Sequence, residues 1–293
     1  MRRAADSPGA LRSTWLATRA AGSFSVWLGG WFAERLWFTP WRADASWRAL
    51  ARQDKWLEGT TPLAVPFGPI RLAGFEAGSG PTVLLVHGWG ERAASLGAFI
   101  GPLVANGHRV VGVDLPAHGN SPGRRTDLPE QAAALRAAAD HLGGIHGIVA
   151  HSMGGFATTM ALHDGLHAEA VTLIAPAVSL NGALARFTPM YKIPPRATAG
   201  LHAAIERRFG RDAWELFAGD RMAPGLDVPA LIVQDRDDPQ VDHSEAVALS
   251  EAWRGSRLVT TEGLGHMRIL RDPEVIAGAT DFMSRAPLEA QAS

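Results

Sequence analysis

One serine stands where a predicted strand turns into a predicted helix, a place from which a hydroxyl group can attack a substrate. The apolar run 147–150 is typical of a buried strand, and the run 156–162 is typical of a helix. Between them, Ser152 has the pattern small-x-Ser-x-Gly, with Ala150 where the better-known form has glycine. Such a turn, a nucleophile elbow, lifts the hydroxyl above the sheet. Because serine between small residues is common in Gly- and Ala-rich chains, the pattern needs partners elsewhere in the chain.

A serine hydroxyl becomes a good nucleophile when a base takes its proton and a third group orients that base. Three aspartates follow the predicted strand 228–234, and a histidine follows the predicted strand 257–261. The candidates are Asp235, Asp237 and Asp238 for the orienting acid and His266 for the base. Each lies just past a strand, where parallel sheets bind their ligands. The sequence therefore predicts a Ser-Asp-His set in that chain order.

The elements that must position these side chains alternate between strands and helices from residue 60 onward. An antiparallel hairpin is expected over 63–65 and 70–75, and further strands over 82–86, 108–113, 147–150, 170–174, 228–234 and 257–261. Helices are expected over 96–106, 128–142 after Asp127, 156–162, 243–253 capped by Asp242, and 273–284. The alternation predicts an α/β fold: a mostly parallel central sheet of about eight strands with helices on both faces.

The chain is expected to divide at changes in composition and rhythm. We predict a Trp-rich helical extension over 1–60, followed by a first core segment over 61–176. A small helical cap without strand rhythm is predicted over 177–226, a second core segment over 227–285 and a tail over 286–293. The cap contains several large apolar residues: Leu180, Leu184, Phe187, Met190, Phe209, Trp214 and Phe217. They suggest a small-molecule substrate with an apolar acyl or aromatic part, or else packing of the cap on its own domain.

From about residue 63 to 285 the chain resembles an α/β-hydrolase-fold serine hydrolase. The resemblance rests on the elbow and on four other motifs: His87-Gly88-Trp89, the run 114–121, Asp238-x-x-Val241 and Gly265-His266. It implies Ser152 as nucleophile, His266 as general base and then acid, and Asp238 as the orienting acid. Asp235 and Asp237 are then interpreted as loop polarity and helix capping. The backbone N–H groups of Trp89 and Met153 would form the oxyanion hole.

The implied activity is hydrolysis of a carboxylic ester through an acyl-enzyme, with substrate choice set by the cap. Thioester, lipid-ester, amide or carbon–carbon bond hydrolysis would use the same machinery. A serine at the elbow, rather than an aspartate, argues against dehalogenase and epoxide-hydrolase chemistry. A non-catalytic binding member of the fold and a lipase at a membrane surface are the alternatives of other classes.

The remaining histidines are interpreted as structural, and no metal and no cofactor are predicted. His163 and His167 are four apart and could share a helix face, but no Glu-x-x-His context supports a metalloprotease. His151 would help to shape the elbow. His87 is expected to hydrogen-bond backbone in its loop, and the loop that contains His118 is interpreted as structural.

The N-terminal segment allows two interpretations. Residues 20–33 form an uncharged run of 14 residues, shorter than the roughly 20 needed to span a bilayer. Phe24, Trp27 and Trp31 recur at helical spacing, Pro40 ends the segment, and 47–57 could form a second helix. This helix could pack on the catalytic domain, or lie on a membrane surface through residues 20–41. A secretory signal is disfavoured because no clear small-x-small cleavage site precedes Glu34. We expect a cytoplasmic protein, with peripheral membrane attachment as the alternative.

Composition narrows the function classes. The chain of 293 residues is 46% apolar and 19% charged, which permits a sizeable core. A net charge of −1 argues against a nucleic-acid partner. The absence of cysteine excludes disulfides, zinc–thiolate sites and a cysteine nucleophile. The oligomeric state is left open by the sequence.

Overall fold

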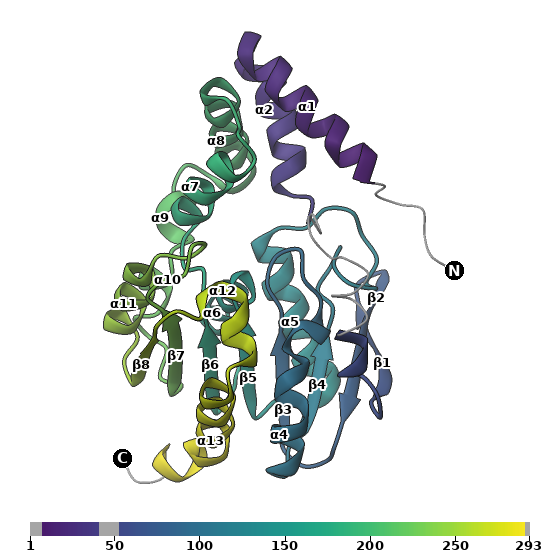
Figure 1. Ribbon diagram of the computed structural model, residues 1–293, viewed down its shortest axis with the longest axis vertical. Helices are drawn as coiled ribbons and strands as arrows, with labels where there is room; N and C mark the ends of the chain where they lie inside the picture. Colours follow the sequence, from purple (N-terminus) through teal and green to yellow (C-terminus); the bar gives the residue numbers. More distant parts are fainter. Residues whose placement is uncertain (1–7, 41–52, 291–293) are drawn as a thin grey trace. The chain divides into compact units, whose positions relative to one another are not determined.

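A computed structural model describes residues 8–40 and 53–290 of the chain (Figure 1). These residues form two compact units. The sheet unit comprises residues 53–123, 127–178 and 219–290, and the helical unit comprises 8–40, 124–126 and 179–218.

The sheet unit is built on one eight-stranded sheet with the order β1-β2-β4-β3-β5-β6-β7-β8. The strands are β1 (Thr61–Phe67), β2 (Ile70–Ala77), β3 (Thr82–Val86), β4 (Arg109–Val113), β5 (Gly147–His151), β6 (Ala170–Ile174), β7 (Ala230–Asp235) and β8 (Ser256–Thr261). The first two strands pair antiparallel, β2 pairs antiparallel with β4, and the strands from β4 to β8 run parallel. Every residue of β3, β5, β6 and β7 is buried, as expected for central parallel strands covered on both faces.

Helices on both faces of the sheet complete this unit and confirm the predicted α/β fold (Figure 1). They are the 3₁₀ helix η1 (Ala93–Phe99), α4 (Ile100–Ala105), α5 (Leu128–Leu142), α6 (Met153–His163), α10 (Gly219–Met222), α11 (His243–Ala252), α12 (Gly265–Arg268), the 3₁₀ helix η2 (Ile269–Arg271) and α13 (Pro273–Ala290). Two of them begin at predicted caps. The side chain of Asp127 accepts from the N–H of Glu130 at 2.9 Å, and that of Asp242 accepts from the N–H of Ser244 at 2.8 Å.

The helical unit consists of α1 (Pro8–Phe24), α2 (Val26–Trp37), α7 (Leu180–Met190), α8 (Pro195–Phe209) and α9 (Ala213–Leu216). Helices α2 and α8 approach closely at two glycines, since a Cβ on Gly30 would lie 2.5 Å from the Cα of Gly200. Six of the seven apolar cap residues pack into the core cluster of this unit: Leu180, Leu184, Phe187, Phe209, Trp214 and Phe217. The structure thus gives these six a packing role, while Met190 is exposed.

Two sequence predictions about helices differ from the structure, and another falls mostly on residues that the structure does not describe. The residues from Phe24 to Arg35 do not form one helix, because Ser25 caps α2 by accepting from the N–H of Leu28 at 3.3 Å. The predicted helix 96–106 starts earlier, as the 3₁₀ helix η1, where the N–H of Ala93 donates to Asp114. The predicted helix 47–57 falls largely on residues 41–52, which lie outside the described residues.

The placement of His163 and His167 also differs from what the sequence allows for them. His163 is the last residue of α6, and Gly165, with φ of +94°, turns the chain away before His167. The pair therefore does not share a helix face. The Nδ1 atom of His163 lies instead 3.2 Å from the carbonyl oxygen of Met222.

Candidate active site

The turn between β5 and α6 places Ser152 in a strained backbone conformation. Its φ and ψ are +52° and −123°, a region that a residue with a Cβ atom rarely adopts. The turn is held from both sides: the N–H of Ser152 donates to the carbonyl oxygen of Ile174 at 3.0 Å, and its own carbonyl oxygen accepts from Gly155 at 2.9 Å. Glycine is needed at 154, because a Cβ there would collide with the carbonyl oxygen of His87. The tight turn leaves Ser152 partly exposed.

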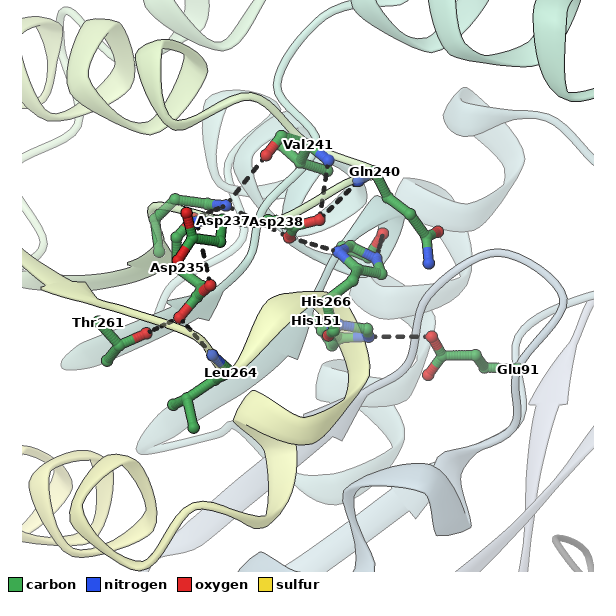
Figure 2. Close-up of polar contacts among 12 residues, drawn as sticks. Glu91, His151, Asp235, Asp237, Asp238, Gln240, Val241, Thr261, Leu264 and His266 are labelled. Carbon is green, nitrogen blue, oxygen red and sulfur yellow. Dashed lines mark hydrogen bonds and ion pairs between the residues drawn. The ribbon is translucent and has the colours of Figure 1, made fainter.

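Two hydrogen-bond contacts join the three side chains predicted for the site, and Figure 2 shows the one between His266 and Asp238. The Nε2 atom of His266 lies 3.0 Å from the Oγ of Ser152, and its Nδ1 atom lies 2.7 Å from the Oδ2 of Asp238. His266 comes from α12, directly after β8, and Asp238 from the loop after β7. The Asp238 side chain is fully buried and that of His266 is 5% exposed. This is the arrangement in which an imidazole can take a proton from a hydroxyl while a carboxylate orients it.

Backbone N–H groups hold the second oxygen of Asp238. Oδ1 accepts from Gln240 at 2.7 Å and from Val241 at 3.1 Å. Burial acts to raise the pKa of Asp238, but the hydrogen bond and the charge of His266, together with these N–H groups, bring it below its ordinary value. Asp238 is therefore a carboxylate at neutral pH.

The other two aspartates of this loop serve the loops themselves. Asp235 accepts from the hydroxyl of Thr261 at 2.8 Å and from the N–H of Leu264 at 3.0 Å (Figure 2). Asp237 accepts from the N–H of Gly263 at 3.1 Å. Both carboxylates thus connect the loop after β7 to the loop after β8, the two segments that carry the acid and the histidine.

The environment of His266 favours its neutral form. Burial lowers its pKa, the hydrogen bond from Nδ1 to Asp238 opposes this shift, and the charge of His151 lowers it further. The net result is a pKa below the ordinary value of 6.5. A neutral imidazole with Nε2 directed at the Ser152 hydroxyl can accept its proton at neutral pH.

The loop after β3 lies beside the serine. A Cβ on Gly88 would lie 3.0 Å from the Cβ of Ser152, and Trp89 is the next residue. His87 connects this loop to the loop after β4, because its Nε2 accepts from the N–H of Leu115 at 3.0 Å. Within its own loop, the Nδ1 of His87 lies 2.8 Å from the carbonyl oxygen of Gly88. The Nδ1 of His118 similarly contacts the carbonyl oxygen of Pro116 at 2.9 Å. His87 thus makes the contact with backbone in its loop that the sequence predicted.

A buried ion pair next to His266 was missed by sequence reasoning. The Nδ1 atom of His151 lies 3.0 Å from the Oε1 of Glu91, and its Nε2 lies 3.0 Å from the carbonyl oxygen of His266 (Figure 2). The other oxygen of Glu91 accepts from the hydroxyl of Ser95 at 2.7 Å. The one signal in the sequence is that Glu91, followed by Arg92, precedes the uncharged, mostly small and apolar stretch 93–106, and this signal does not indicate His151 as the partner.

The pKa values of this pair move apart. Burial alone would raise the pKa of Glu91, but the charge and contact of His151 and the Ser95 hydroxyl lower it to about 2. Burial alone would lower the pKa of His151, but the charge of Glu91 and the two contacts raise it above its ordinary value. Both shifts in pKa favour the charged forms, so we interpret the pair as a carboxylate beside an imidazolium.

Within residues 8–40 and 53–290, no three His, Asp or Glu side chains are placed so that they could hold a metal ion. A surface hollow of about 550 Å³ lies in the helical unit and is lined by Thr188, Pro189, Ile193, Pro195, Thr198, Ala199 and His202. Neither Ser152 nor its two partners line it. None of the described helices combines the length and the apolar character needed to cross a membrane.

Comparison with known proteins supports the fold. Residues 83–279 match the model of the alpha/beta hydrolase family. A pimeloyl-[acyl-carrier protein] methyl ester esterase from Methylococcus capsulatus is 44% identical over 46 residues, a match that covers 16% of this chain and only 18% of that relative.

Two solved structures are similar over most of the chain. A lipase described as putative, from Acinetobacter baumannii, is 19% identical with a TM-score of 0.64, covering 84% of this chain and 98% of its own. An esterase from Pyrococcus furiosus is 18% identical with a TM-score of 0.64, and the match covers 85% of this chain and 97% of the esterase chain. At this identity the likeness concerns the fold. The family match spans well over half of the residues, and the chain therefore belongs to the alpha/beta hydrolase family.

Proposed function

We propose that the protein is a serine hydrolase that cleaves a carboxylic ester through an acyl-enzyme. The observation that carries the proposal is the continuous contact from Asp238 through His266 to Ser152, at 2.7 Å and 3.0 Å. Strain at the serine supports it as well, since strained backbone in folded proteins is concentrated at functional sites.

In the first half-reaction, Oγ of Ser152 attacks the ester carbonyl carbon while Nε2 of His266 takes the hydroxyl proton. The carboxylate of Asp238 holds the Nδ1–H and stabilises the imidazolium that forms. The negative charge that develops on the carbonyl oxygen is bound by the backbone N–H groups of Trp89 and Met153. Loss of one such donor commonly lowers kcat by roughly 100- to 1,000-fold. The alcohol then leaves with the proton from His266.

In the second half-reaction, water gives a proton to His266 and attacks the acyl carbon. The same tetrahedral charge forms and is bound in the same place. Collapse of this intermediate releases the acid and returns the proton to Oγ of Ser152, so one water is consumed for each ester cleaved.

Glu91 and His151 act as positioning residues in this account. The imidazolium of His151 donates toward the carbonyl oxygen of His266, and so fixes the backbone of the base. Glu91 lies two residues after the oxyanion donor Trp89 and is paired with His151. One buried pair thereby connects the oxyanion loop, the nucleophile strand and the base.

Two observations favour an ester as the bond that the protein cleaves. The relative with the 46-residue match is by name a methyl ester esterase, and the similar structures include an esterase. An apolar acyl ester is the proposed substrate class. Thioester and lipid-ester hydrolysis use the same triad, so a panel of p-nitrophenyl esters and acyl thioesters of increasing chain length separates the alternatives.

The test is turnover of p-nitrophenyl esters by wild type, Ser152→Ala and Ser284→Ala. Ser284 is an exposed serine on α13 and serves as the matched control. We expect Ser152→Ala to lose at least roughly 10⁴-fold in kcat and Ser284→Ala to keep wild-type activity. Retained activity in Ser152→Ala would refute the proposed nucleophile.

A further inference from the structure

Large apolar side chains are exposed where α1 meets α2. The exposed fractions of Phe24 and Trp27 are 85% and 71%, far above those of ordinary aromatic residues in a soluble domain. We call this group the apical cluster, and it consists of Phe24, Val26, Trp27, Leu28 and Trp31. Its members lie within eight residues of the chain, at the end of α1 and in the first half of α2, on either side of the break at Ser25 (Figure 1 shows these two helices).

The packing of the helical unit explains why these side chains face outward. The buried residues of α2 are small or lie in its second half: Gly29, Gly30, Ala33 and Leu36. A Cβ on Gly29 would lie 2.5 Å from the Cα of Gly22 in α1, so the small face of α2 is closed by its neighbours. Helices usually bury their large apolar residues and expose small or polar ones. In the first half of α2 the order is reversed, which indicates that the large residues there contact something outside the unit.

One arginine contacts the apical cluster, and two more lie on or beside α1. The guanidinium of Arg35 lies 4.9 Å from the centre of the Trp31 ring, and that of Arg19 lies 5.1 Å from the Trp15 ring. The Nη1 atom of Arg196 lies 3.4 Å from the carbonyl oxygen of Ser23, beside the turn.

Acidic residues are scarce there. Glu34 is the one acidic residue in the sequence from 8 to 40, and it pairs with Arg125 at 3.3 Å. The charge next to the exposed tryptophans is therefore positive.

We propose that the apical cluster docks the helical unit onto the surface of a lipid bilayer that contains anionic lipids. Tryptophan is favoured at the boundary between headgroups and acyl chains because its ring is apolar and its N–H is polar. Arginine beside it adds attraction to anionic headgroups. Docking of this kind needs no spanning helix, and the described helices include none.

A second copy of this chain fits the patch less well. A twofold contact through the apical cluster would bring Arg19 and Arg35 of one copy close to the same arginines of the other. Like charges in a desolvated contact oppose association, whereas anionic headgroups attract both.

The experiment is co-sedimentation of the full chain with phosphatidylcholine vesicles, with and without phosphatidylglycerol. We expect binding that increases with phosphatidylglycerol and falls at high salt. The double variant Phe24→Ser/Trp27→Ser should lower the partition coefficient by roughly tenfold or more. Arg35→Gln should lower it by about fivefold, and only on vesicles with phosphatidylglycerol. Trp56→Ser is the matched control, because Trp56 is 44% exposed but lies in the sheet unit, and it should bind as wild type.

Two further measurements distinguish a loss of vesicle binding from a loss of the folded structure. Turnover of a soluble ester and the Tm of the double variant should equal those of wild type, which shows that the fold is retained. Equal vesicle binding by wild type and double variant overturns the proposal, as does a dimer that the double variant dissociates in size-exclusion chromatography. The proposal is independent of the chemistry at Ser152, so Ser152→Ala should bind vesicles like wild type.

Discussion

The carboxylate of Glu91 lies 3.0 Å from Nδ1 of His151, and the other nitrogen of that imidazole lies 3.0 Å from the backbone oxygen of His266. The His151 side chain is fully buried, and that of Glu91 is 14% exposed. A charged pair in such a place is costly to break, because the remaining charge has no water to replace its partner. The pair therefore makes the geometry around the proposed base depend on a residue in the loop after β3.

Replacing Glu91 by glutamine should destabilise the protein in a pH-dependent way. The pKa of Glu91 is lowered from 4.5 to about 2, so its contribution is present above pH 4.5 and lost as pH falls toward 2. The pKa of His151 is raised above 6.5, so its contribution is present below pH 6.5 and lost as pH rises through the folded-state value. The difference in unfolding free energy between wild type and Glu91→Gln should thus be largest between pH 4.5 and 6.5, at about 3 kcal/mol.

Urea denaturation of both proteins across this pH range measures the difference. Glu58→Gln, at an exposed position, is the control and should show little change at any pH. A loss in Glu91→Gln that does not vary with pH would argue against the ion pair.

The pH dependence of ester hydrolysis should report His266. The base must be neutral to accept the proton of Ser152, and the buried environment lowers the pKa of His266 below 6.5. The value of kcat/KM for a soluble ester should therefore rise with pH through one ionisation below 6.5 and stay level toward neutral pH. An ionisation clearly above 6.5 would contradict the environment described for this histidine.

Removing the Cβ atom at position 152 should relieve backbone strain. Ser152 has φ of +52°, which glycine adopts without steric cost. We expect Ser152→Gly to be more stable than Ser152→Ala by roughly 1 kcal/mol, although both variants are inactive. Chemical denaturation of the two variants is the measurement, and an alanine variant at least as stable as the glycine variant would disprove stored strain at this turn.

The choice among the three aspartates can be tested with matched amide substitutions. Asp238→Asn keeps the shape of the side chain but removes the charge that orients the imidazole, so kcat should fall by roughly 10³- to 10⁴-fold. Asp237→Asn keeps an oxygen that can accept from the N–H of Gly263, and its kcat should stay within a few-fold of wild type. A larger loss in Asp237→Asn than in Asp238→Asn would reassign the acid.

Local signals were sufficient for most of the sheet. The strands β3 (Thr82–Val86) and β6 (Ala170–Ile174) begin and end where the sequence predicts, because continuous apolar runs between turn residues mark buried parallel strands. The helix α5 is also as predicted, because Asp127 caps its start and Gly143, with φ of +76°, ends it. Ser152, Asp238 and His266 lie just past β5, β7 and β8, three strands whose ends the sequence also predicts to within two residues.

Features that depend on distant contacts could not be read from the sequence. The close approach of α2 and α8 depends on Gly30 meeting Gly200, and neither glycine is distinctive in its own segment. The pairing of Glu91 with His151 joins residues 60 positions apart, and nothing near either residue indicates the other. The break at Ser25 had a local signal, a serine that can cap a helix, but the helical spacing on both sides of it concealed the break.

The most direct test of the account is covalent labelling of the intact protein with a fluorophosphonate, followed by peptide mass spectrometry. A hydroxyl activated by His266 and Asp238 should react, and the adduct should map to Ser152. It should be absent in Ser152→Ala and strongly reduced in Asp238→Asn, whose imidazole has lost its carboxylate partner. A folded wild-type protein that gives no adduct, or an adduct on another serine, would contradict the assignment of Ser152 as the nucleophile.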